Sequence, residues 1–136
     1  MGNHILYAST VDFNGLHPIF IFFLENTKIK DLHIQIRLHP RERTVEKKLI
    51  FKNQMDKLNI NYKFDETENW LETNHIDNLI IISPWSSTIE DAYDNNYKTI
   101  IIDKSGKERF NNLIDNINCY YSNDLENTLK LINKSQ

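Results

Sequence analysis

The stretches Leu79-Ile80-Ile81-Ile82 and Thr99-Ile100-Ile101-Ile102 decide the fold. Each is a short, continuous run of mostly β-branched residues, which is typical of a strand buried on both faces of a parallel sheet. Two parallel strands need a crossover between them, and that crossover is usually a helix. The two stretches therefore predict a strand–helix–strand unit.

The segment between these strands carries the signals of a helix. Ser86 or Ser87 can cap it, and the helix is expected to run to about Asp94. Glu90 is placed for a capping box.

The same alternation of short apolar runs and longer amphipathic stretches extends outward from this unit. Further strands are expected at His4–Ala8, His33–Leu38, Tyr62–Phe64 and Cys119–Tyr121. Further helices are expected at Leu16–Asn26, Thr44–Leu58, Glu68–Thr73, Lys107–Ile114 and Asp124–Ile132, the last capped by Asn123. This order predicts an α/β fold: a single Rossmann-like, doubly wound parallel sheet of five or six strands, in one domain over residues 1–136.

Composition excludes several classes of protein. Hydrophobic residues make up 40% and charged residues 26% of the 136 residues, which is typical of a globular domain. A net charge of −3 argues against a general nucleic-acid binder. The single cysteine, Cys119, excludes an intramolecular disulfide framework and a cysteine-based zinc site.

Targeting signals are not evident. The longest apolar run near the N-terminus, Pro18–Leu24, is far shorter than the roughly 20 residues that span a bilayer, and no basic region precedes it. We therefore expect no transmembrane segment and a cytoplasmic location, with peripheral attachment at the inner face of the membrane as an alternative.

Polar residues that suit a phosphate group follow two of the expected strands. His39 comes directly after the second strand, and Ser86, Ser87 and Thr88 open the helix after the fourth. Ligands of such sheets bind at the carboxyl ends of the strands, where hydroxyl groups and a helix N-terminus can hold an anion. The alternative is purely structural: the serines cap their helix, and His39 caps the end of its own strand.

Other phosphate and metal motifs do not occur. Neither a G-x-G-x-x-G motif after the first strand nor a P-loop is present, which disfavours a dinucleotide-binding enzyme and a P-loop NTPase. Asp12, Asp103 and Lys104 lack the acidic pair that a receiver domain needs after its first strand. The histidines show no metal-ligand spacing, so we expect neither a metal nor another cofactor.

Two stretches resemble a known family. Ile34–Glu42 contains His39-Pro40, and Ile82–Ala92 contains the serine pair. Together they resemble the HP and SS motifs of bacterial sialyltransferases, with glycosyltransferase family 52 nearest and the polysialyltransferases next. The resemblance implies the C-terminal half of a GT-B enzyme, which binds CMP-sialic acid without a metal in the synthesis of surface glycans such as lipooligosaccharide or capsule.

The resemblance also implies roles for the residues after the second and fourth strands. His39 would contact the donor phosphate, with Arg41 beside it, and would help the nucleotide leave. Ser86, Ser87 and Thr88 would hold that phosphate at the helix N-terminus.

Further roles follow for the nucleoside. In the GT-B pattern an acidic residue before a small one binds the ribose hydroxyls, and Asp91 fits that place, with Glu90 as the alternative. By topology, the floor under the base would come from Phe64, Asp65 and Glu66.

A GT-B enzyme has two such halves, and this sequence has room for one. We therefore expect a separate N-terminal half or a partner subunit that brings the glycan acceptor. An apolar surface over Phe20–Phe23 and Trp85 would serve such a contact or a homodimer. Two alternatives stay open: a non-catalytic nucleotide-binding or assembly module, and half of a glycerophosphate transferase that uses CDP-glycerol.

Overall fold

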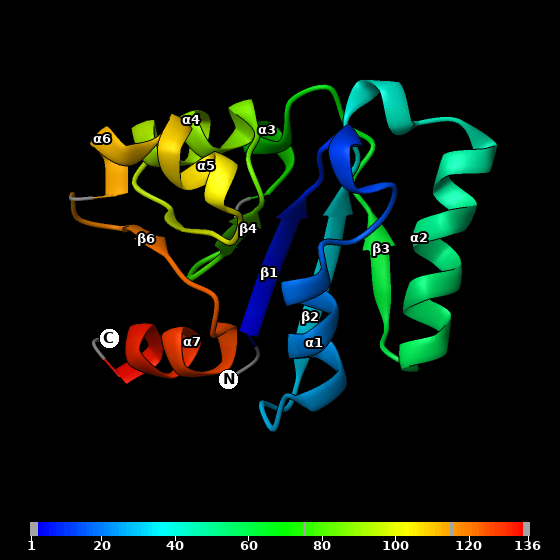
Figure 1. Cartoon of the computed structure of the whole chain (residues 1–136), viewed down its shortest axis with the longest axis horizontal. Coiled ribbons are helices and arrows are strands. Elements are labelled where there is room, and N and C mark those ends of the chain that lie inside the picture. The colour runs from blue at the N-terminus through cyan, green and yellow to red at the C-terminus, as the bar shows by residue number, and fades with distance from the viewer. Residues whose placement is uncertain (1–2, 75, 115, 135–136) are drawn as a thin grey trace.

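The structure is a computed structural model that describes residues 3–74, 76–114 and 116–134 (Figure 1). Within these residues six strands pair in parallel in one sheet, in the order β3-β2-β1-β4-β5-β6. The strands are β1 (Asn3–Ala8), β2 (Leu32–Arg37), β3 (Tyr62–Phe64), β4 (Ile80–Ser83), β5 (Lys98–Ile101) and β6 (Cys119–Tyr121). This is the strand order of a Rossmann-like sheet, so the predicted fold class is confirmed.

Helices cover both faces of the sheet. The larger core cluster joins the sheet to α1 (Pro18–Asn26), α2 (Val45–Leu58) and α7 (Leu125–Lys134). Smaller clusters on the opposite face involve α3 (Trp70–Thr73), α4 (Ser87–Asp94) and α6 (Asn111–Ile114), and α5 (Lys104–Arg109) approaches β5 through Gly106, next to the Ile101 side chain. Two 3-10 turns, η1 (Val11–Phe13) and η2 (Pro40–Glu42), follow β1 and β2.

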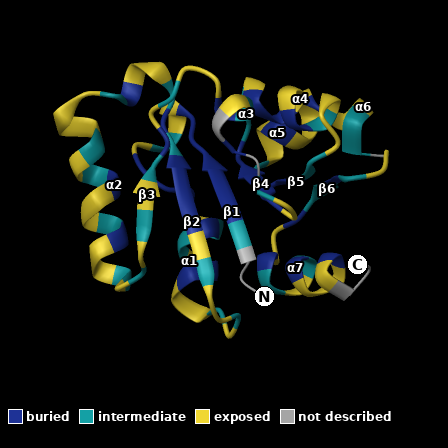
Figure 2. Ribbon diagram, turned by 180° about the vertical axis from the view of Figure 1, so that it is seen from behind, coloured by how far each residue is buried: buried dark blue, intermediate teal, exposed yellow. Residues whose placement is uncertain are grey.

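Alternate residues of the central strands supply the two halves of the core. Ile5 and Tyr7 of β1 belong to the larger cluster, whereas Leu6 between them packs with Trp70 on the other face. This period of two is what a sheet buried on both sides requires. Figure 2 shows the result: the central strands are buried along most of their length, and exposed residues lie on the outer sides of the helices.

Several helix ends differ from the prediction. α1 begins at Pro18 because the side chain of His17 caps it by accepting the Ile19 N–H (3.0 Å). The expected helix at Lys107–Ile114 is instead the two short helices α5 and α6.

Two predicted caps are corrected as well. The Asp124 carboxylate accepts the Asn127 N–H at 3.2 Å at the start of α7, where Asn123 was expected to cap. Ser86 caps α4, so that Glu90 lies one position too far along the helix for a capping box.

Candidate functional site

A pocket of about 340 Å³ opens at the carboxyl edge of the sheet. It is formed by the ends of β1 and β2, the turn η2, the segment 68–70 and the first turns of α4. Five residues predicted for donor binding line it together: His39, Ser86, Ser87, Thr88 and Asp91. The two sequence motifs therefore meet in one cavity, although they lie far apart in the chain.

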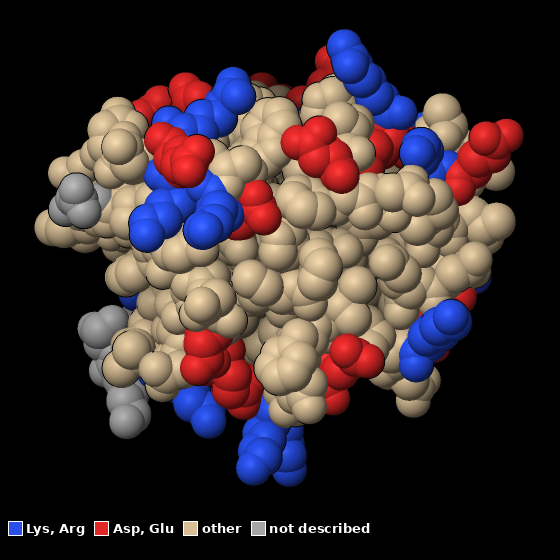
Figure 3. All heavy atoms as spheres, in the orientation of Figure 1, with Lys and Arg blue, Asp and Glu red and all other residues tan. Residues whose placement is uncertain are grey.

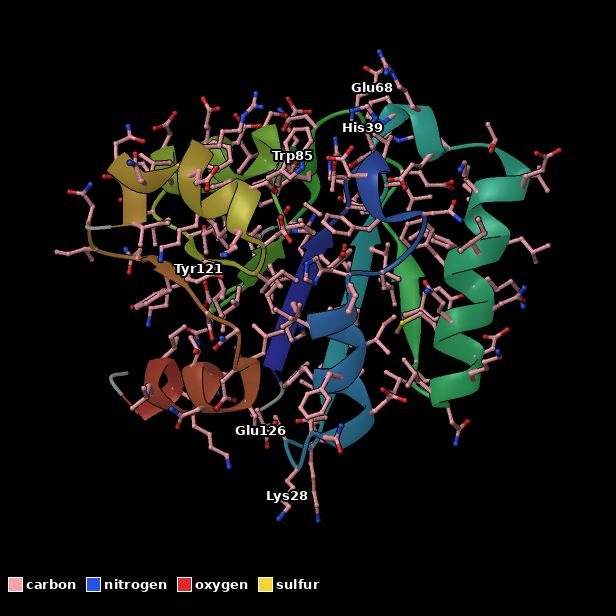
Figure 4. All side chains as sticks on the ribbon, viewed as in Figure 1. Lys28, His39, Glu68, Trp85, Tyr121 and Glu126 are labelled. Atoms are coloured by element: carbon pink, nitrogen blue, oxygen red, sulfur yellow. The ribbon has the colours of Figure 1, made fainter. Side chains whose placement is uncertain are left out.

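The position of the crevice differs in one respect from the simplest expectation. The strand order reverses between β1 and β4, so β2, which precedes His39, lies one strand away from that point. The pocket reaches from β4 across the end of β1 to β2, and so still includes His39. Figure 4 shows His39, Glu68 and Trp85 at this same edge.

His39 is held by a reciprocal cap. Its Nδ1 accepts the backbone N–H of Arg41 (3.1 Å), and its own N–H donates to Oε1 of Glu42 (3.2 Å). Burial, together with the nearby charges of Arg41 and Arg43, lowers the pKa of His39 below its ordinary value. A histidine with a lowered pKa favours the neutral form of the ring at pH 7.

Glu42 is the buried partner in this turn. Its side chain is almost fully enclosed, with 2% of the residue exposed. Burial raises the pKa of Glu42, while hydrogen bonds from Ser9 and from the His39 backbone oppose the rise. Sequence analysis missed its role, although a histidine followed three residues later by glutamate is the spacing of a capping box.

Three neighbouring residues at the start of α4, Ser86, Ser87 and Thr88, differ in their hydrogen bonds. The Ser86 hydroxyl accepts the Thr88 N–H (3.1 Å) and so acts as the cap. Ser87 is exposed in the pocket, and its N–H and hydroxyl have no partner among the described residues. Thr88 is only 7% exposed, and within the described part of the chain its hydroxyl has no hydrogen-bond partner either. The pocket thus meets free donors at a helix N-terminus.

Two arginines that the sequence analysis did not single out also line the pocket. Arg37 ends β2 and donates from its guanidinium to the carbonyls of Thr67 (2.7 Å) and Glu68 (2.9 Å). Arg43 donates its Nε–H to the Leu38 carbonyl (3.3 Å), and its terminal nitrogens have no hydrogen-bond partner among the described residues. Arg43 is therefore the cation best placed to meet a bound anion.

Other predicted residues lie outside the pocket lining. The side chain of Arg41 is exposed, and its contribution to the site is its backbone N–H. Glu90 is exposed on α4.

The expected floor for the base has other contacts. Buried Asp65 lies 3.5 Å from the Arg37 guanidinium and accepts the Thr67 hydroxyl (2.6 Å). Glu66 forms an ion pair with Lys48, whose ammonium also lies over the Phe64 ring. Phe64, Asp65 and Glu66 therefore fix the loop after β3 and do not line the pocket.

On the far side of the crevice Trp85 joins two loops. Its Nε1–H donates to Asp12 in the turn after β1 (2.9 Å), and the Arg109 guanidinium lies 5.0 Å from its ring. Nearby, Asp103 caps α5 and accepts the Nε2–H of His17, the cap of α1, at 3.0 Å. These contacts fix the start of three helices around the crevice.

The expected apolar surface is smaller than predicted. Phe20 and Phe23 are buried in the larger core cluster, and Ile21 is half-buried. Phe22 is 66% exposed and lies on a groove of about 430 Å³ between α1 and the start of α7. Figure 3 views the molecule from this side and shows uncharged residues across the centre of the face, with charged ones toward its margin.

Comparisons with known proteins add no family to these observations: no protein-family model, curated protein or solved structure matches the chain. Among the described residues, no group of three or more histidine, cysteine, aspartate or glutamate side chains could hold a metal ion. No helix in the described ranges is long and apolar enough to cross a membrane.

Proposed function

We propose that the pocket at the carboxyl edge binds the nucleotide of a CMP-linked sugar, and that the chain is the donor-binding half of a sialyltransferase-like GT-B glycosyltransferase. One observation carries the proposal: His39 and the start of α4, which come from the two motifs, line the same pocket. Free N–H and hydroxyl donors at a helix N-terminus are the groups that bind phosphate esters.

The balance of charge favours a donor with one phosphate. Arg37 and Arg43 line the pocket, but the charge of Arg37 is already paired with Asp65. Glu68 and Asp91 bring negative charge to the same wall, and His39 is neutral. The second phosphate of a diphosphate would add negative charge next to these carboxylates, which would repel it. The CMP-linked donor therefore fits better than CDP-glycerol.

In this proposal, different residues of the pocket act on the phosphate and on the ribose during transfer of the sugar. Negative charge develops on the phosphate as CMP leaves, and Arg43, the Nε2–H of the His39 ring and the start of α4 would stabilise it. The Asp91 carboxylate would accept hydrogen bonds from the ribose hydroxyls. The glycan acceptor and the base that activates its hydroxyl would come from a second half or a partner subunit.

A panel of ligands tests this proposal. Thermal shifts would be measured with CMP, CDP, UDP, GDP and NAD, because a ligand at 100 times its Kd stabilises the folded state by about 2.7 kcal/mol. We expect CMP to give the largest shift. A larger shift with CDP would favour the glycerophosphate transferase, and no shift with any nucleotide would contradict a nucleotide site.

The role of Asp91 has its own matched comparison. The wild type should bind CMP more tightly than 2′-deoxy-CMP, whereas Asp91→Asn should reduce that preference. Glu90→Gln is the control, since Glu90 lies next to Asp91 but outside the pocket. An equal loss of preference in both variants would contradict the ribose contact.

A further inference from the structure

The turn after β2 fixes which nitrogen of His39 carries its proton. The Arg41 N–H points at Nδ1 from 3.1 Å, and a backbone N–H can only donate. Nδ1 must therefore present its lone pair, and the proton of the neutral ring lies on Nε2. Nε2 has no hydrogen-bond partner in the described part of the chain, and the ring lines the pocket.

Protonation of the ring would oppose this turn. A proton on Nδ1 would face the Arg41 N–H and remove the hydrogen bond that caps η2. The charged groups that face the ring act in both directions: Arg41 and Arg43 disfavour the imidazolium, and Asp12 favours it. Glu42 accepts the backbone N–H of His39, and Glu68 and Asp91 line the same pocket.

We propose that His39 serves the bound phosphate as a neutral donor of fixed tautomer, through Nε2–H, and that it does not act as a cation. The identity of the ligand rests on the proposed function, whereas the tautomer stands on the turn alone. The charge that meets the phosphate then comes from Arg43 and the start of α4. Affinity should consequently stay level when the pH falls through the usual range of histidine titration.

Nitrogen NMR tests the tautomer directly. Long-range ¹⁵N–¹H correlation spectra of the free protein at pH 7 should show the His39 ring as the neutral Nε2–H form. The chain has five histidines, and the signal that disappears in His39→Gln identifies the ring. An Nδ1–H tautomer or an imidazolium at this position would overturn the proposal.

The pH dependence of binding tests the role in the site. The probe is the methyl ester of CMP, whose phosphodiester keeps one negative charge across the range. We expect its Kd to change by less than about twofold between pH 7.5 and pH 5.5. A gain of fivefold or more on acidification would show that the imidazolium binds, and would overturn the proposal.

Two variants distinguish the role of Nδ1, which accepts a hydrogen bond, from that of Nε2, which donates one. His39→Asn keeps an oxygen that can accept the Arg41 N–H but loses the donor at Nε2, so it should fold normally and bind at least about tenfold more weakly. His39→Gln can place an amide donor near Nε2 and should retain more binding than His39→Asn. Wild-type affinity in His39→Asn would overturn the donor role. If the wild type binds no CMP compound, the proposed function fails, and the NMR result alone decides the tautomer.

Discussion

Adjacent serines at the start of α4 separate a structural role from a binding role. Ser86 accepts the Thr88 N–H, whereas Ser87 faces the pocket without a partner among the described residues. We expect Ser86→Ala to lower stability by about 1 kcal/mol, the usual cost of a lost cap, with a small effect on CMP affinity. Ser87→Ala should leave stability nearly unchanged and weaken CMP binding by about 1.5 kcal/mol or more.

Urea unfolding and calorimetric titration with CMP would measure both quantities in both variants. Each serine serves as the control for the other, because the two side chains are identical and adjacent. Wild-type affinity in Ser87→Ala would contradict the phosphate contact and leave only the cap. The sequence suggested that either serine could cap α4, and only the backbone geometry at Ser86 distinguishes them.

Thr88 offers a test in which stability and binding change in opposite directions. The residue is only 7% exposed and lines the pocket, and its hydroxyl has no hydrogen-bond partner in the described ranges. Thr88→Val keeps the shape and removes the hydroxyl, so unfolding free energy should stay equal or rise by up to about 1 kcal/mol. CMP should bind more weakly. Lower stability with unchanged affinity would show that the hydroxyl serves the fold.

At the scale of elements, the turn η2 links pH to stability through Glu42. Burial raises the pKa of Glu42 in the folded state above its value in the unfolded chain. The folded state therefore holds the proton more tightly, and this contribution to stability is lost as the pH rises through the folded-state pKa. Glu42→Gln stays neutral and can still accept the backbone N–H of His39, so it should gain stability relative to the wild type as the pH rises above the usual range of a glutamate carboxyl.

Urea denaturation of the two proteins at pH 5, 6, 7 and 8 would check this. Glu46→Gln on α2 is the control, because it makes the same substitution at an exposed position. A constant difference between wild type and Glu42→Gln across the range would show that the carboxyl titrates normally.

Strands β4 and β5 could be predicted from the sequence, whereas the break between α5 and α6 could not. The runs in β4 and β5 predicted their strands because continuous β-branched residues are typical of a strand that is buried on both faces of a parallel sheet. Helix α5 ends at Arg109 and α6 begins at Asn111, a break that local composition does not mark. Phe110, which lies between them, is buried against Ile101 and Cys119, so tertiary packing decides the break.

The residues of the site that directly follow a strand could be predicted from the sequence. His39 and Ser87 follow β2 and β4, and parallel strands bring such positions to one edge. Arg43 could not be found in this way, because its side chain reaches the pocket by folding back to the Leu38 carbonyl. Asp65 was placed in the site for its position after β3, but its pairing with Arg37 depends on contacts across the sheet.

At the scale of the whole molecule, Phe22 is an exposed aromatic side chain on the groove between α1 and α7. Homodimer formation, expected from the sequence, stays a prediction. If this groove mediates it, Phe22→Glu should shift sedimentation at high concentration toward the monomer, while Phe13→Glu, outside the groove, should not. A wild-type monomer over a wide range of concentration would contradict self-association.

The last prediction concerns chemistry by the whole chain. On the proposed function, Arg43, the Nε2–H of the His39 ring and the start of α4 stabilise the leaving CMP without a cation. CMP binding should therefore be equal in EDTA and in Mg²⁺. On the proposed function, turnover of CMP-sialic acid should be slow or undetectable with this chain alone, because the acceptor hydroxyl and its base would come from a second half or a partner subunit.

The measurement is CMP release from CMP-sialic acid with a lactose-type acceptor, in EDTA and in Mg²⁺ or Mn²⁺, for the wild type and for His39→Asn. Release that needs the metal would contradict charge stabilisation by the protein groups alone. Rapid transfer by the 136-residue chain would contradict its role as one half of an enzyme. Tight CMP binding with no transfer, even when candidate partner halves are added, would favour the non-catalytic module, since preorganised donors accelerate a reaction only where an acceptor is positioned against the donor.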